Sequence, residues 1–123
     1  MRKIVLIIYA LLWIATEVMA SVASGKTVIR IERRSGITDY TDIVRQHIES
    51  SPKGNLQLIF APGIFHFYPE KATGKYLAVS NNDNGYKRIA FDFDTMSDIS
   101  ILGDNTVFIF HGRLVPFCFR SCK

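Results

Sequence analysis

Short apolar segments separated by turns of only a few residues are the feature that most constrains the fold of this chain. Thr106–Phe110 and Leu114–Phe119 carry apolar side chains at successive positions, and the three-residue turn 111–113 joins them. Strands that are apolar on both sides are typical of sheets buried on both faces, as parallel sheets are. Strands repeated about every 8 to 12 residues fit a β-sandwich, or a β-solenoid whose coils bury their apolar faces against one another. The sequence therefore predicts a mostly β fold of one of these two architectures.

The rest of the chain predicts further strands and a single helix. In Tyr40–Glu49 the apolar residues recur at helical spacing, and Thr38 or Asp39 can cap the first amides. Further strands are predicted at Thr27–Glu32, Leu56–Phe60, Ile64–Tyr68, Ile89–Phe93 and Asp98–Gly103. Residues 69–86 are polar and rich in Gly and Asn, which predicts a loop. In a solenoid we expect the helix to cap the open end and to shield a sheet edge from other chains.

The N-terminal segment has the three-part pattern of a secretory signal. A positively charged start precedes twelve uncharged residues, Ile4–Ala15, and small residues surround the expected cleavage after Ala23, with cleavage after Ala20 as the alternative. A membrane-spanning helix needs about 20 apolar residues, and Glu17 interrupts the run too early for that. We therefore expect residues 1–23 to be a signal peptide. The mature chain is then expected in the periplasm, on the cell surface or in the medium, with no transmembrane segment.

Charge and composition exclude several classes of protein. The 123 residues include 15 basic and 11 acidic side chains; losing Arg2, Lys3 and Glu17 with the signal leaves 13 and 10, a net charge of +3. The adjacent pairs Arg33–Arg34 and Lys87–Arg88 stand far apart in the sequence and are interpreted as solvated surface, so no nucleic-acid partner is expected. An apolar fraction of 48% excludes a disordered chain, and two cysteines are too few for a disulfide scaffold.

Several stretches of the chain carry a family resemblance, beginning with a helix opened by Thr-Asp and the run Ile59–Phe67. Three more are Phe65–Ala72, Ser80–Phe91 and Phe108–Phe117. In this order they resemble the start of the bacterial α-1,3-galactosidases, glycoside hydrolase family 110, which remove terminal galactose from blood-group-B-type glycans. The resemblance covers roughly residues 36–117. It implies a right-handed parallel β-helix of the pectin-lyase type, with the predicted helix as its N-terminal cap and galactose-terminated glycans as substrates.

The chain departs from this family at its C-terminus. Family members are several times longer, and Cys118–Lys123 does not continue their pattern. The resemblance therefore implies an N-terminal fragment, in which residues 24–123 form the cap and first coils of an incomplete hydrolase domain. The acidic residues that the family uses for inverting hydrolysis lie in later coils, so no catalytic residue is assigned and the fragment is expected to be inactive alone. Cys118 and Cys122 can pair only if the backbone folds back, and otherwise stay free.

The candidates for substrate binding are Asn82, Asp83, His111 and Arg113. The amide-rich segment 81–85 can hydrogen-bond sugar hydroxyls or supply oxygen ligands to calcium, although Asn and Gly also favour turns. His111 and Arg113 flank Gly112 and can face a sugar-binding groove, but a turn with an exposed arginine is the simpler interpretation. No spacing of His and Cys predicts a metal site, and no cofactor is expected.

Asp92 and Asp94 alternate along a predicted strand, which puts both carboxylates on one face about 6.5 to 7 Å apart. Inverting glycosidases hold two carboxyl groups about 6.5 to 9.5 Å apart. The interleaved Phe91 and Phe93 favour a simpler interpretation, in which the aspartates form the solvent face of a half-buried strand. Two functions remain open: a fragment of a hydrolase resembling α-1,3-galactosidase, and a small exported carbohydrate-binding or structural β module without enzymatic activity.

Overall fold

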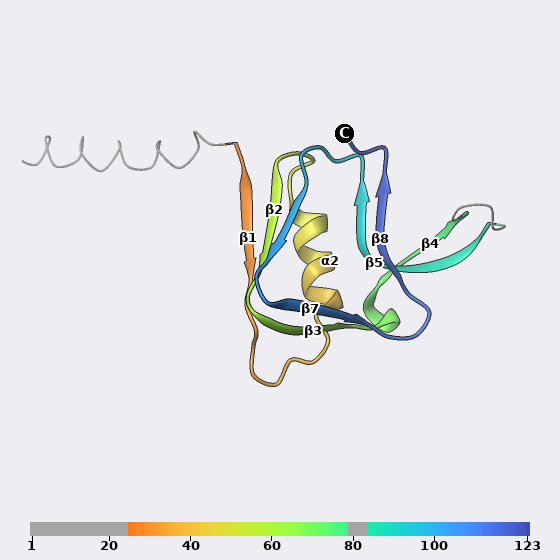
Figure 1. Ribbon diagram of the computed structural model, residues 1–123. Coiled ribbons are helices and arrows are strands. Elements are labelled where there is room, and N and C mark those ends of the chain that lie inside the picture. The colour runs from red at the N-terminus through yellow and green to blue at the C-terminus, as the bar shows by residue number, and fades with distance from the viewer. Residues whose placement is uncertain (1–24, 79–83) are drawn as a thin grey trace, which may run out of the picture.

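The computed structural model describes residues 25–78 and 84–123, and these form a mostly β fold with one α-helix (Figure 1). The elements in chain order are β1 (Thr27–Ile31), α2 (Thr41–Ser50), β2 (Leu56–Phe60), β3 (Gly63–Phe67), the 3-10 helix η1 (Pro69–Lys71), β4 (Thr73–Leu77), β5 (Gly85–Asp94), β6 (Ser100–Gly103), β7 (Thr106–Phe110) and β8 (Val115–Arg120). The mostly β class and the single α-helix are as predicted. The expected signal peptide, residues 1–23, lies outside the described residues.

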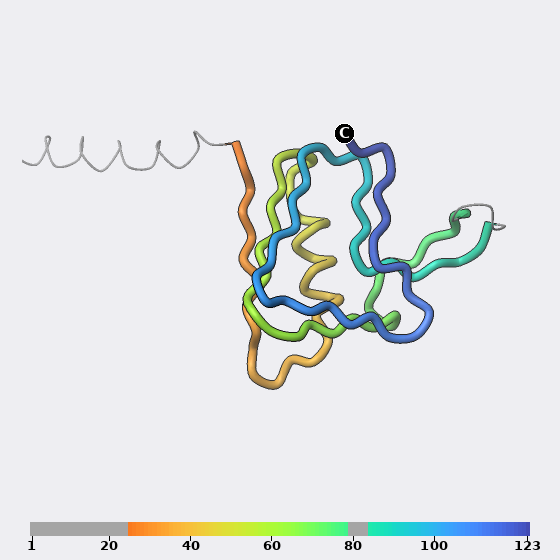
Figure 2. The backbone as a smooth tube through the Cα atoms, viewed as in Figure 1, coloured from red at the N-terminus to blue at the C-terminus, as the bar shows by residue number. Residues whose placement is uncertain are grey.

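The strands pair in parallel across successive turns of the chain. β1, β2 and β6 form one sheet, β3 and β7 a second, and β5 and β8 pair in a third, to which β4 adds antiparallel. The three segments β2, β3 and β5 are thus matched in order by β6, β7 and β8. Figure 2 shows the second turn of the chain following the three-sided path of the first. Turns of the backbone therefore lie on one another, and the interior between the three sheets holds the core.

Aromatic side chains fill this interior. Phe60, Phe65, Phe67, Phe91 and Phe93 alternate with outward residues on their strands and are at most 2% exposed. Register pairs Phe65 with Phe108 and Phe91 with Phe117. Burying each such ring contributes about 1.5 to 3 kcal/mol, and well-placed ring pairs add about 0.5 to 1.5 kcal/mol. The ladder of rings therefore holds the two turns of the chain together.

The helix α2 closes one end of the interior. Val44 and Ile48 on one face are buried, as the helical periodicity predicts. Buried Thr41 accepts a hydrogen bond on Oγ1 from the backbone N–H of Tyr68 at 2.8 Å, which ties the helix start to the segment after β3. Asp39 Oδ1 accepts a hydrogen bond from the backbone N–H of Thr41 at 2.9 Å. Of the two predicted capping residues, Asp39 rather than Thr38 therefore bonds the first amide of the helix. The observed helix therefore contains nine of the ten residues predicted to be helical, Tyr40–Glu49. It begins and ends one residue later than predicted, at Thr41 and Ser50.

The segment from 69 to 86 is where the loop prediction is wrong. It contains η1, β4 and the first residues of β5, and β4 and β5 form an antiparallel ladder that includes Lys75 opposite Lys87. Tyr86 lies across Gly74, where a Cβ would fall 1.9 Å from the tyrosine oxygen. A glycine that looks like a turn signal in the sequence thus provides room for a ring in a strand.

The second turn of the chain is covered on one side only. β6, β7 and β8 each lie at the edge of a sheet within the described residues. Phe117 and Phe119 stack on Phe91 and Phe93, with ring centroids 4.8 and 5.1 Å apart, yet they are 38% and 56% exposed. Their inner faces contact the first turn, and their outer faces are open.

Candidate functional site

An ion cluster joins three strands on the outer side of the β4–β5–β8 sheet. Lys75 Nζ on β4 contacts Asp92 Oδ2 at 2.5 Å and Asp94 Oδ2 at 3.9 Å. Arg120 Nη2 on β8 contacts Asp92 Oδ1 at 3.4 Å and Asp94 Oδ2 at 2.9 Å. Two carboxylates on β5 are therefore matched by two cations, one from each neighbouring strand. The carboxylates border a hollow of about 190 Å³ beneath α2, which Arg45 and Lys53 also line.

Each aspartate in this ion cluster has a different exposure. The side chain of Asp94 is 42% exposed, which agrees with the predicted solvent face, whereas that of Asp92 is only 8% exposed because Lys75 and Arg120 cover it. Burial by itself lowers the pKa of Arg120, but the charges of Asp92 and Asp94 outweigh it and raise the pKa above its ordinary value. The cluster is thus a mutually neutralising network in which Arg120 stays charged.

This geometry does not fit an inverting pair of acid and base. A single nitrogen, Arg120 Nη2, contacts oxygens of both aspartates at 3.4 and 2.9 Å. Those oxygens are therefore closer together than the roughly 6.5 to 9.5 Å that leaves room for an attacking water. The ion cluster ties β4, β5 and β8 together and does not form a catalytic pair.

His111 belongs to a second group, on the outer side of β3 and β7. Its Nε2 lies 2.8 Å from Nδ1 of His66, so one ring donates the shared proton to the other. The ring of Tyr68 lies parallel to that of His111, with centroids 4.2 Å apart and an interplanar angle of 2°. His66 on β3, Tyr68 directly after β3 and His111 directly after β7 thus form one cluster of rings, in which His111 contacts both of the others.

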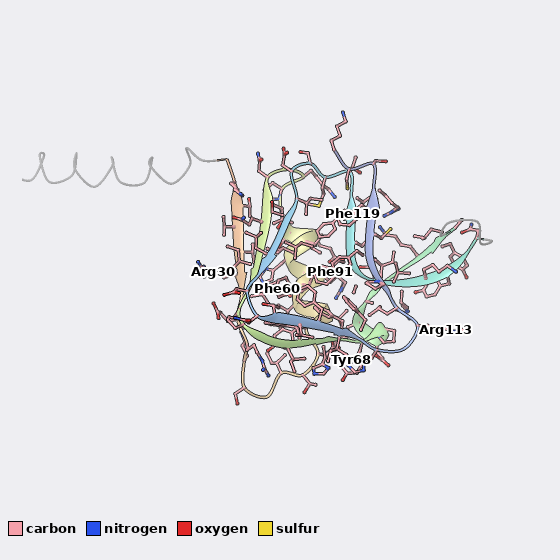
Figure 3. All side chains as sticks on the ribbon, in the orientation of Figure 1. Arg30, Phe60, Tyr68, Phe91, Arg113 and Phe119 are labelled. Carbon is pink, nitrogen blue, oxygen red and sulfur yellow. The ribbon has the colours of Figure 1, made fainter. Side chains whose placement is uncertain are left out.

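Arg113 lies elsewhere, on the turn between β7 and β8, and Figure 3 shows it at the edge of the fold near the β4–β5 hairpin. It lines a hollow of about 390 Å³. The other lining residues are Tyr86, Lys87, Arg88, Leu114 and Val115. The structure therefore separates the two predicted residues: His111 joins the cluster of rings with His66 and Tyr68, and Arg113 joins a basic hollow. The exposed side chain of Arg113 agrees with the simpler interpretation of this turn.

Asn82 and Asp83, the other two candidates, lie outside the described residues, so their predicted role stays a prediction. Cys118 and Cys122 are not bonded to each other. β8 holds Cys118 in extended backbone, and the positive φ of 50° at Ser121 turns the chain back, which brings Cys122 against the core. Across residues 25–78 and 84–123, no group of three or more His, Cys, Asp or Glu side chains is arranged to hold a metal ion.

Sequence reasoning missed the partners of each group. Lys75 and Arg120 lie 17 and 28 positions from Asp92, and no local pattern connects them with it. The sequence predicts that Lys87 and Arg88 belong to the solvated surface, because no other basic pair stands near them in the chain. The apolar run that begins at Ile89 is the signal that could have placed Lys87 and Arg88 at the start of a buried strand. That strand, β5, pairs with β8 from Ile89 and Val115 onward, which brings the two cations near the segment just before β8.

Comparison with known proteins finds similarity to one kind of enzyme. The chain is 38% identical over 64 residues to alpha-1,3-galactosidase A of Shewanella woodyi, a match that covers 52% of this chain and 10% of that protein. It is 33% identical over 60 residues to alpha-1,3-galactosidase B of Phocaeicola vulgatus, covering 48% and 10%. It is 30% identical over 83 residues to alpha-1,3-galactosidase B of Bacteroides thetaiotaomicron, covering 67% and 12%. No protein-family model matches the chain.

These matches confirm the resemblance to α-1,3-galactosidases that the sequence stretches indicate. The chain spans about a tenth of the length of the curated relatives it matches. The similarity therefore concerns a short portion of a much longer glycosidase. Within the described residues, no helix is long and apolar enough to cross a membrane.

Proposed function

We propose that this chain is the N-terminal portion of an exported glycoside hydrolase that resembles α-1,3-galactosidases and acts on glycans ending in α-1,3-linked galactose. The observation that carries the proposal is the similarity to three such enzymes over 48 to 67% of the chain, at 30 to 38% identity. Residues 1–23 are a signal peptide, and residues 24–123 are the cap and first coils of the hydrolase domain. The protein is accordingly periplasmic, bound to the cell surface or secreted.

The arrangement of the strands supports a right-handed parallel β-helix as the architecture of this portion. Parallel registers such as Leu58 with Ile101 and Phe65 with Phe108 repeat on separate sheets around one aromatic core. The helix α2 covers one end, where Val44 and Ile48 enter the core. The open outer faces of Phe117 and Phe119 at the other end suit a further coil, whose inward side chains would continue the ladder of rings.

The role of this portion is structural support for a catalytic site formed by later coils. Inverting hydrolysis requires a protonated carboxyl group and an ionised carboxylate with room for a water between them. The alternating pair on β5 is instead neutralised by Lys75 and Arg120. We therefore propose no catalytic residue in this chain and expect no hydrolysis by the chain alone.

A chimera tests the proposed function. Residues 36–117 of this chain replace the matching N-terminal portion of the Shewanella woodyi enzyme, and release of galactose from an α-1,3-linked galactobioside is measured. We expect activity within about tenfold of the parent, because a compatible cap supports the same coils. The matched control carries Phe91→Asp in the grafted portion, which puts a charge into the core at a fully buried position and should abolish folding and activity.

Two results would contradict the proposed function. The first is a chimera that is monomeric and has the far-ultraviolet circular dichroism of the parent but releases no galactose. The second is galactose release by the present chain without any added portion. Mass spectrometry of the exported protein separately tests the signal peptide, with a mature N-terminus at Ser24 as the expected result.

A further inference from the structure

The basic hollow beside the β4–β5 hairpin is formed by two parts of the chain that meet only in the fold. Ile89 on β5 pairs with Val115 on β8, so the residues before each of them, Arg88 and Leu114, enter the same region. Lys87 and Arg113 extend the lining on either side. The hollow measures about 390 Å³, which is within the range of roughly 300 to 1,000 Å³ typical of small-molecule sites.

Positive charge in this hollow is not balanced within the described residues. Its three cations are Lys87, Arg88 and Arg113, and none of its lining residues is acidic. None of the three lies within 4 Å of a carboxylate in the described part of the chain, whereas Lys75 and Arg120 further along the same sheet each contact two. Cations gathered without a counter-charge repel one another, and an anion that binds between them removes this repulsion.

The remaining lining provides a surface for a ring. Tyr86 is 51% exposed, and the guanidinium carbon of Arg88 lies 5.1 Å from the centroid of its ring. This cation–π contact and a hydrogen bond that Arg88 Nη1 donates to the backbone carbonyl of Ala72 at 3.5 Å orient the guanidinium, whose remaining N–H groups can donate to a sulfate or carboxylate. Gly74 leaves the space that Tyr86 occupies. Leu114 and Val115 add an apolar floor, so the hollow combines an anion site with a surface for the apolar face of a sugar.

We propose that this hollow binds an acidic saccharide, with a sulfate or carboxylate group held by Arg88 and Arg113, Lys87 adding to the positive charge around it, and the sugar ring placed against Tyr86. The anion part of the proposal stands on the geometry of the hollow, and the saccharide part rests on the proposed function. The bound group anchors a charged glycan to this portion of the protein.

Binding to the full chain tests this proposal, with galactose 6-sulfate as the probe and titration calorimetry as the measurement. Unsubstituted galactose and inorganic sulfate are the reference ligands. We expect galactose 6-sulfate to bind at least tenfold more tightly than either. Arg113→Gln should weaken its binding about fivefold, and the double variant Arg88→Gln with Arg113→Gln at least tenfold. Arg30→Gln is the matched control, because Arg30 is an exposed arginine on the opposite side of the fold (Figure 3).

Each alternative result overturns a stated part of the proposal. Equal affinity for galactose and galactose 6-sulfate contradicts the anion site, and so does an equal loss in Arg30→Gln. Inorganic sulfate binding as tightly as the sulfated sugar contradicts the saccharide part. No binding of galactose 6-sulfate by a folded chain contradicts the whole. Arg113 makes no hydrogen bond among the described residues, so its single variant remains informative even if Arg88→Gln disturbs the hairpin. The chimera assay uses no sulfated sugar. Its result therefore tests the proposed function independently of whether the hollow binds galactose 6-sulfate.

Discussion

The two ends of strand β5 carry charge in opposite ways. At its C-terminal end, Asp92 and Asp94 are matched by Lys75 and Arg120, and the Asp92 side chain is 8% exposed. At its N-terminal end, Lys87 and Arg88 face a hollow together with Arg113, and no carboxylate of the described residues joins them. One strand thus contains a closed ion network and an open basic surface, fewer than ten residues apart.

The difference separates structural charge from charge that is available to a ligand. A partly buried pair loses most when one partner is removed, because the remaining charge stays desolvated. An exposed cation without a partner contributes little to stability, and its field extends into solvent. Asp92 and Asp94, whose spacing is compatible with a catalytic pair but favours a solvent-facing strand, both carry structural charge of this first kind. We therefore expect substitutions at the two ends of β5 to have effects of different size and on different measurements.

The largest effect is expected from Asp92→Asn. This change keeps the shape of the side chain and leaves Lys75 and Arg120 with only the exposed Asp94. We expect the free energy of unfolding in urea to fall by about 2 kcal/mol, below the range for fully buried pairs because both cations are about a third exposed. Asp104→Asn, at an exposed aspartate, is the control and should change it by less than about 0.5 kcal/mol. Equal losses of unfolding free energy in Asp92→Asn and Asp104→Asn would contradict a structural role for the charges at the C-terminal end of β5.

A double-mutant cycle of Asp92→Asn and Arg120→Gln sharpens the same comparison. We expect a favourable coupling of about 1 kcal/mol between the two side chains in urea unfolding. The corresponding cycle of Arg88→Gln and Arg113→Gln should give a coupling near zero or slightly unfavourable, since these charges repel. The pKa of Arg120 in the folded chain is raised above its ordinary value. The contribution of Arg120 to stability is therefore fully present at any pH below that ordinary value, and it is lost only at more alkaline pH. The coupling should therefore be constant between about pH 6 and 9; a coupling that disappears within this range would refute the assigned contact.

Salt should affect the basic hollow more than the ion cluster. Raising sodium chloride from about 0.05 to about 0.5 M shortens the Debye length several-fold, and exposed charges are screened most. We expect the affinity for galactose 6-sulfate to fall about fivefold, as measured by calorimetry. The unfolding penalty of Asp92→Asn should stay nearly unchanged over the same range. A ligand affinity that is independent of salt would count against an electrostatic site.

The smallest expected effect is on the stability of Arg113→Gln. Removing one of three neighbouring cations relieves repulsion, so the free energy of unfolding should stay the same or rise by up to about 0.5 kcal/mol. Thermal and urea unfolding of this variant and of Arg30→Gln give the comparison. A loss of more than about 1 kcal/mol specific to Arg113→Gln would mean that this arginine has a structural partner.

Much of the regular structure follows from local pattern. The predicted strands Leu56–Phe60 and Thr106–Phe110 coincide with β2 and β7, because apolar and β-branched runs bounded by turn residues are specific enough to identify a strand. The α2 helix follows from its amphipathic spacing. The β4–β5 hairpin was not predicted, because its strands are polar and contain Gly74 and Gly85, residues that are depleted in strands generally.

The candidate sites were less accessible to sequence reasoning. The alternation of Asp92 and Asp94 correctly predicts that both carboxylates share a face, and the pattern says nothing of what approaches that face. Lys75 reaches Asp92 only through the unpredicted hairpin, and Arg120 only through the parallel register of β5 and β8. His111 and Arg113, neighbours on one turn, end in separate groups since one precedes and the other follows the change of direction at Gly112, whose φ is +67°.

The sequence by itself determined the class of fold, the apolar faces of the strands and helix, and the resemblance to α-1,3-galactosidases, because each of these depends on short segments of contiguous residues. The tertiary structure alone decided which charges are neutralised and which are left open. Charge interactions depend on the distance between side chains and on their exposure to water, and residues 17 to 28 positions apart come within 4 Å only when the strands pair.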